Sequence, residues 1–131
     1  MNQRLFIAGA AFAVAVSLAS TALAGANDYV FEPVKAELKK GDDATVAVRL
    51  LHMPTGKPVI DAVIIRTRID MAPDGMAEMA SPLTALPSQE PGVYAFKTDL
   101  TMAGRWLFSI AAKVQGEPET VVGKITFKVN K

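Results

Sequence analysis

The chain has 131 residues, of which 50% are hydrophobic and 21% are charged, and it contains no cysteine. This length and composition fit one globular domain and exclude a disordered chain or a two-domain enzyme. The absence of cysteine excludes disulfides, thiolate metal centres, c-type haem attachment and a thiol nucleophile. The formal net charge of +1 gives no electrostatic reason to expect a nucleic-acid partner.

Residues 1–24 have the pattern of a secretory signal peptide. Arg4 supplies the positive start, Leu5 to Val16 is an uncharged apolar run, and Ala22-Leu23-Ala24 is a small-x-small cleavage signature. We therefore expect an N-terminal signal helix, cleavage after this triplet and export to the periplasm. The alternative is a membrane-anchored chain with an uncleaved leader, because the uncharged stretch from Leu5 to Asn27 is long enough to span a bilayer.

In the expected mature domain, residues 25–131, apolar and polar residues alternate. Alternation with a period of two is typical of antiparallel strands that have one buried and one solvent-exposed face. In chain order, strands are expected at residues 34–38, 44–50, 63–69, 83–86, 93–100, 105–114 and 121–129. The pattern predicts an all-β fold, an immunoglobulin-like antiparallel β-sandwich of about seven strands. Trp106 is the expected core anchor, and Val63, Ile65, Thr67 and Ile69 are the expected inward set of their strand.

Residues 70–89 interrupt this alternation and are expected to form a loop that leads to the short strand at 83–86. The segment contains Met71, Met76 and Met79, and the only histidine, His52, lies beside Met53. Thioether sulfur favours Cu(I) over hard cations, and imidazole binds both Cu(I) and Cu(II). We predict a metal site at Met76 and Met79, with Met71 and His52 as helpers. The alternative is that these methionines only fill gaps beneath the loop.

Catalytic chemistry is not expected. The sequence has no Gly-rich phosphate loop, no Gly-x-Ser-x-Gly elbow and no pair of histidines for a hydrolytic zinc centre, and no small-molecule substrate is evident. Asp42 and Asp43 lack the further spaced oxygen ligands that calcium requires. Arg66 and Arg68 form a short basic stripe on an outward strand face, where solvation or pairing with acidic side chains is expected.

Three segments resemble the YtkA-like domain, which is related to FixH: Gly56-Lys57-Pro58-Val59, Pro91-Gly92-Val93-Tyr94 and Met102-Ala103-Gly104-Arg105-Trp106. The resemblance spans roughly residues 39–129. It implies an immunoglobulin-like domain of the export compartment that handles copper or another heavy metal without catalysis. It also implies a candidate partner, a membrane complex for metal efflux or for copper-oxidase assembly. The methionines of residues 70–89 correspond to the methionine cluster in the family's loop.

Two functions therefore remain open. The first is a non-catalytic periplasmic accessory domain that binds copper, as Cu(I), or another soft metal through the methionine-containing loop. The second is a metal-free interaction module that docks on a membrane transporter or an oxidase-assembly complex through a sheet edge or the same loop.

Overall fold

The computed structural model describes residues 26–88 and 90–131, so the expected signal peptide lies outside the described residues. The elements, in chain order, are η2 (Ala26–Asp28), β1 (Tyr29–Pro33), β2 (Glu37–Lys39), β3 (Gly41–His52), β4 (Lys57–Pro58), β5 (Val63–Met71), η3 (Ala72–Asp74), β6 (Met76–Ser81), β7 (Leu83–Leu86), β8 (Val93–Leu100), β9 (Gly104–Lys113) and β10 (Val121–Asn130). The two η elements are single turns of 3-10 helix. No helix in this part of the chain is long and apolar enough to cross a membrane.

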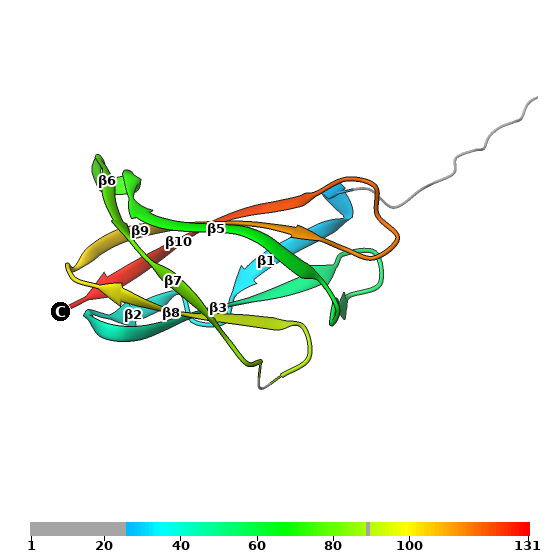
Figure 1. The fold of residues 1–131 in the computed structure, drawn as a ribbon, viewed down its shortest axis with the longest axis horizontal. Coiled ribbons are helices and arrows are strands. Elements are labelled where there is room, and N and C mark those ends of the chain that lie inside the picture. Colours follow the sequence, from blue (N-terminus) through cyan, green and yellow to red (C-terminus); the bar gives the residue numbers. More distant parts are fainter. Residues whose placement is uncertain (1–25, 89) are drawn as a thin grey trace, which may run out of the picture.

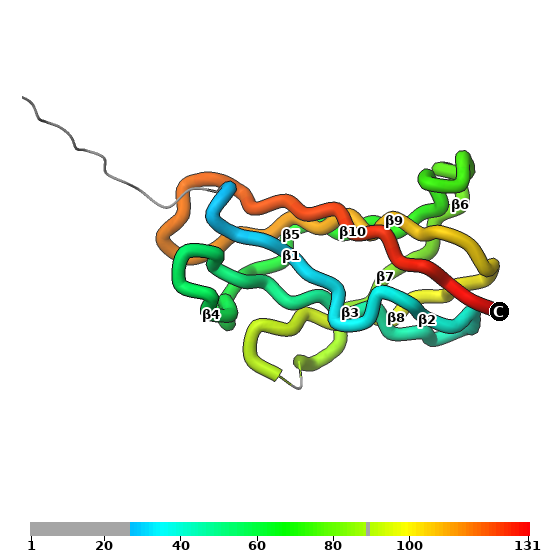
Figure 2. The backbone as a smooth tube through the Cα atoms, turned by 180° about the vertical axis from the view of Figure 1, so that it is seen from behind, coloured from blue at the N-terminus to red at the C-terminus, as the bar shows by residue number. Residues whose placement is uncertain are grey.

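The strands form two sheets that pack face to face (Figures 1 and 2). The first sheet has the order β1-β3-β8-β7, with β4 paired to β3, and the second has the order β2-β10-β9-β5-β6. The predicted all-β, immunoglobulin-like sandwich is therefore confirmed. The strands of the described residues are more numerous than the expected seven, because β1, β4 and β6 lie outside the expected segments, whereas β2 overlaps the segment at 34–38. One pair, β2 with β10, is parallel rather than antiparallel.

Aromatic side chains join the two sheets. Trp106, Phe108 and Phe127 of the second sheet are fully buried, and the ring of Phe108 lies 5.5 Å from that of Phe96 in the first sheet. Burying each large apolar side chain contributes about 1.5–3 kcal/mol to stability. The Trp106 indole also donates a hydrogen bond to the carbonyl of Met102 at 3.0 Å, so its polar atom is satisfied. The expectation that Trp106 anchors the core is confirmed.

Strand β5 departs from the inward set expected for it. Its register against β9 shifts between Ile64 and Arg66, which is a β-bulge. A bulge inserts one residue and moves the preceding side chains to the other face. Ile64 therefore packs against the core, whereas Val63 and Ile65 are exposed, so the prediction for these two residues is wrong.

Two further expectations are corrected. The strand expected at residues 34–38 is interrupted: the chain leaves β1 at Pro33, leaves Val34 exposed and pairs again only in β2. Residues 70–89 are not an extended loop, because η3, β6 and β7 occupy most of them. The short strand expected at residues 83–86 is confirmed as β7.

Candidate functional site

The methionine-containing segment folds back on itself as a hairpin at one edge of the second sheet. After β5, Pro73 stands in the first turn of η3, where its missing N–H needs no partner. Gly75 then takes a left-handed conformation with φ of 77°, and its N–H donates to the carbonyl of Ala72 at 2.8 Å. This local turn reverses the chain into β6, the edge strand.

The hairpin places three methionine residues in one segment at a corner of the sandwich. Met71 is paired with Met76 across β5 and β6, at the turn end of the hairpin, after a shift of register between Asp70 and Met71. Met79 lies three residues further along β6. Met71 is fully buried, whereas Met76 and Met79 are partly exposed and pack against the core. We call Met71, Met76 and Met79 the methionine corner.

Gly104, at the start of β9, closes the inner side of this corner. A Cβ atom at this position would lie 2.7 Å from Cε of Met71 and 2.5 Å from Oδ2 of Asp74. Its φ of 142° is also one that L side chains rarely adopt. Glycine is therefore favoured here by the backbone conformation, and an added methyl group would also displace the ends of the Met71 and Asp74 side chains.

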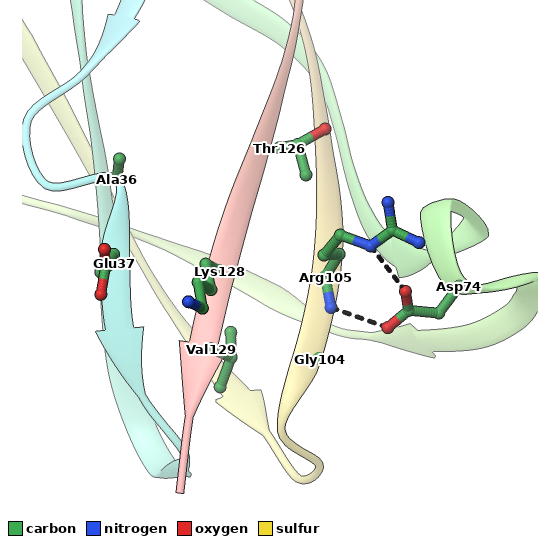
Figure 3. A pocket seen from close by; sticks show the side chains of 8 residues that line it. All are labelled: Ala36, Glu37, Asp74, Gly104, Arg105, Thr126, Lys128 and Val129. Atoms are coloured by element: carbon green, nitrogen blue, oxygen red, sulfur yellow. Dashed lines mark hydrogen bonds and ion pairs between the residues drawn. The ribbon is translucent and has the colours of Figure 1, made fainter.

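Asp74 fastens the hairpin to β9. Its carboxylate accepts the main-chain N–H of Arg105 at 2.8 Å and the side-chain Nε–H of the same residue at 2.7 Å (Figure 3). Nη2 of Arg105 donates in addition to the carbonyl of Pro73 at 2.7 Å. These hydrogen bonds from Arg105, the backbone one first, hold the pKa of Asp74 below its usual range.

A second arginine holds the other side of the hairpin. Arg68 of β5 forms an ion pair with Asp70 at 2.7 Å and donates to the carbonyl of Ala77 in β6 at 2.9 Å. The other oxygen of the Asp70 carboxylate accepts the N–H of Ala72 at 2.9 Å. Arg68, Asp70, Asp74 and Arg105 thus form a polar frame around the methionine corner that the sequence analysis did not identify. The sequence feature that could have indicated this frame is the pair Asp74-Gly75, because these residue types are typical of a turn.

His52 lies at the other end of the sandwich. It ends β3, whose first residue, Gly41, is paired with Leu100 just before the turn into β9. At about 3.3 Å per residue, the length of β3 separates His52 from that end by about 35 Å. His52 Nδ1 shares a hydrogen bond with Thr55 Oγ1 at 2.8 Å, and its ring lies 5.0 Å from that of Tyr29. The structure therefore places the three methionines in one hairpin and the histidine at the opposite end of the sandwich.

The remaining two methionines of the described residues lie away from the corner. Met53 is 61% exposed and follows His52, and Met102 is 40% exposed in the turn between β8 and β9. Within residues 26–88 and 90–131, no group of three His, Asp or Glu side chains could hold a metal ion. The donors that this arrangement offers to a soft ion are therefore the thioethers of the methionine corner.

Comparisons with known proteins give one family. A family model described as YtkA-like matches residues 23–111, and it carries no catalytic assignment. No curated protein matches the chain. Among solved structures, the chain is similar to the Lin-41 filamin domain, with 14% identity, a TM-score of 0.49 and coverage of 79% of this chain and 92% of that one. It is also similar to the ZirS C-terminal domain, with 16% identity, a TM-score of 0.45 and coverage of 95% and 88%.

Proposed function

The chain belongs to the YtkA-like family, and from this premise we propose that it is an exported, non-catalytic accessory domain that handles copper or another soft metal. The observation that carries the proposal is the pairing of Met71 with Met76, with Met79 on the same edge strand. Three neutral sulfur donors at one corner suit Cu(I), which accepts few ligands and prefers soft ones.

Met76 and Met79 are the proposed primary ligands. Both are partly exposed on β6, so an ion can reach them from solvent. Methionine has three rotatable side-chain bonds, and its sulfur can turn outward without a change of backbone. Met71 is the proposed third donor from beneath, and it reaches an ion only when its side chain leaves the core. His52 lies at the other end of the molecule and is not part of the proposed site.

A competition experiment tests this proposal. The protein is added to Cu(I) held by bicinchoninate, and the loss of the coloured complex reports transfer of the metal. We expect transfer to the unmodified protein and none to the Met76→Leu/Met79→Leu variant. The Met53→Leu/Met102→Leu variant removes the same number of thioethers from other places and serves as the control. The proposal fails if the unmodified protein leaves the absorbance of the complex unchanged.

The second candidate is a metal-free module that docks on a membrane transporter or an oxidase-assembly complex. The observation in its favour is that β6 and β7 are edge strands of the two sheets and follow one another through Pro82. Small exposed residues on these strands, such as Ala77, Ala80 and Ala85, leave the edges accessible to another chain. A crosslinking amino acid placed at Ala85 tests this candidate. Crosslinked products that contain a membrane complex are expected, and the absence of such products would contradict the candidate.

Export is part of the proposal, with retention through an uncleaved leader as its alternative. Mass spectrometry of the protein recovered from cells distinguishes them. A chain that begins at Gly25 supports a cleaved signal peptide and a periplasmic domain. A chain that still contains Arg4, recovered with the membranes, supports the anchored form.

A further inference from the structure

The two sheets carry different charges. The five strands of the second sheet contain seven Lys and Arg against three Asp and Glu, whereas those of the first sheet contain three against four. The small net charge of the whole chain therefore conceals a basic face. This face is the outer surface of β5, β9 and β10, opposite the core.

The strand register concentrates cations at the centre of this face. Ser109 of β9 is paired with Arg68 on one side and with Lys124 on the other. Arg66 is paired in the same way with Ala111. The small side chains of Ser109 and Ala111 leave a hollow of about 230 Å³, which Arg66, Arg68 and Lys124 line.

Acidic side chains neutralise only part of this charge. Arg68 is bound to Asp70, and Arg105 is bound to Asp74. Arg66, Lys113, Lys124 and Lys128 are exposed, and the ion pairs formed within residues 26–88 and 90–131 do not include them. Lys128 is paired with Arg105 of β9 on one side and with Glu37 of β2 on the other (Figure 3). Asp74 binds Arg105 and Glu37 faces Lys128, so the cations with no acidic residue opposite them in the register include Arg66 and Lys124 at the hollow, where an external anion is favoured.

Exposed apolar side chains lie at one end of the same face. Val63 is 62% exposed and paired with Lys113, and Val122 is 58% exposed and paired with Ala111. The start of the described chain is at this end as well, because Tyr29 donates to Glu117 in the β9–β10 turn at 2.9 Å. A leader retained in a bilayer would therefore hold this end at the membrane.

We propose that the outer face of β5, β9 and β10 docks on a membrane that contains anionic phospholipids. A headgroup phosphate occupies the hollow and is bound by Arg66 and Lys124, because guanidinium and ammonium groups bind phosphate oxygens well. Val63 and Val122 contact the boundary between headgroups and acyl chains. Cations mixed with apolar side chains are typical of surfaces that lie on membranes, and they fit an acidic protein segment less well. This inference does not depend on metal binding.

Co-sedimentation with vesicles tests the proposal. Both sheets and their core lie within residues 26–131, so a chain that begins at Gly25 contains the complete fold. It is expected to bind vesicles of equal parts phosphatidylglycerol and phosphatidylcholine and not vesicles of phosphatidylcholine alone, and added salt should weaken the binding. Arg66→Gln/Lys124→Gln should weaken it roughly tenfold or more.

The control variant Lys57→Gln/Lys97→Gln removes the same charge from two exposed residues of the first sheet. It should bind nearly as the unmodified chain does, and Val63→Ser/Val122→Ser should bind more weakly without any change of charge. Equal losses in the two charge variants would overturn the proposal, because they would show a general charge effect. Two other outcomes would also overturn it. One is binding of inorganic phosphate in the hollow with no vesicle binding, and the other is binding of polyglutamate in place of vesicles.

Discussion

Asp74 and Arg105 are 31 positions apart, yet the carboxylate of Asp74 accepts both the main-chain N–H and the Nε–H of Arg105, at 2.8 and 2.7 Å. The first hydrogen bond fixes where β9 begins, and the second fixes the direction of the arginine side chain. Because Asp74 belongs to η3, the same contact sets the position of β6 and of the methionines on it. The geometry of the methionine corner therefore depends on the charge of Asp74.

Asp74→Asn should loosen this hairpin. An amide keeps one acceptor oxygen but loses the charge that strengthens both hydrogen bonds. We expect the methyl NMR signals of Met71, Met76 and Met79 to shift and broaden while the rest of the spectrum is retained. Asp43→Asn is the control, because the Asp43 carboxylate forms an exposed ion pair with Lys97 at 3.5 Å and the main-chain hydrogen bond from Asp43 to Asp99 is kept. Unchanged methyl signals in Asp74→Asn would contradict the role of the contact.

The same contact predicts how stability changes in acid. The pKa of Asp74 is lower in the folded chain than its ordinary value of 3.8. Its contribution to the free energy of unfolding is therefore fully present above that ordinary value and is lost as the pH falls through the folded-state pKa. Urea unfolding at a series of pH values should show a smaller loss of stability below pH 3.8 in Asp74→Asn than in the unmodified chain. Parallel curves for the two proteins would contradict this.

Gly104→Ala should destabilise the fold more than an equivalent change elsewhere. The new methyl group would meet Met71 and Asp74 at 2.7 and 2.5 Å, and the φ of 142° would be strained as well. We expect a loss of about 2–4 kcal/mol in the free energy of unfolding. Gly116→Ala provides the comparison, since it shares a positive φ but meets no atom within 4 Å, and it should cost about 1 kcal/mol. Equal losses would show that backbone strain alone decides the outcome.

Period-two alternation predicted most strands and both layers because the two faces of each strand differ in burial. The alternation of Phe96, Thr98 and Leu100, for example, corresponds directly to buried positions of β8. It could not predict the bulge in β5, because one inserted residue changes the face without changing the composition. Alternation also could not predict the β5–β6 hairpin, because a local turn at Gly75 and a contact with Arg105 hold the hairpin in place. The distance of His52 from the methionines follows from the length and the register of β3. The local sequence around His52 does not determine either of them.

Met71 should contribute to stability whether or not metal binds. Its side chain is fully buried, so Met71→Ala should lower the free energy of unfolding by about 2–5 kcal/mol. Met71→Leu keeps nearly the same volume and should cost less than about 1.5 kcal/mol. Met53→Ala, at a residue that is 61% exposed, should change stability by less than about 0.5 kcal/mol. A small effect of Met71→Ala in urea unfolding would show that the side chain already spends much of its time outside the core.

Tyr29 should titrate well above an ordinary tyrosine. Burial, then the hydrogen bond to Glu117 and the charge of that carboxylate, raise the pKa of Tyr29 from 10.0 to about 12. The folded chain therefore keeps this contribution to stability below pH 10.0 and loses it as the pH rises toward 12. Glu117→Gln removes the charge but retains an acceptor, so the pKa of Tyr29 should fall yet stay above 10.0, since burial is the larger cause. The ¹³Cζ chemical shift of Tyr29 measures this pKa directly. Glu119→Gln, at an exposed residue of the same turn, should leave the pKa unchanged, and an equal fall in both variants would assign the effect to general charge and not to the Glu117 contact.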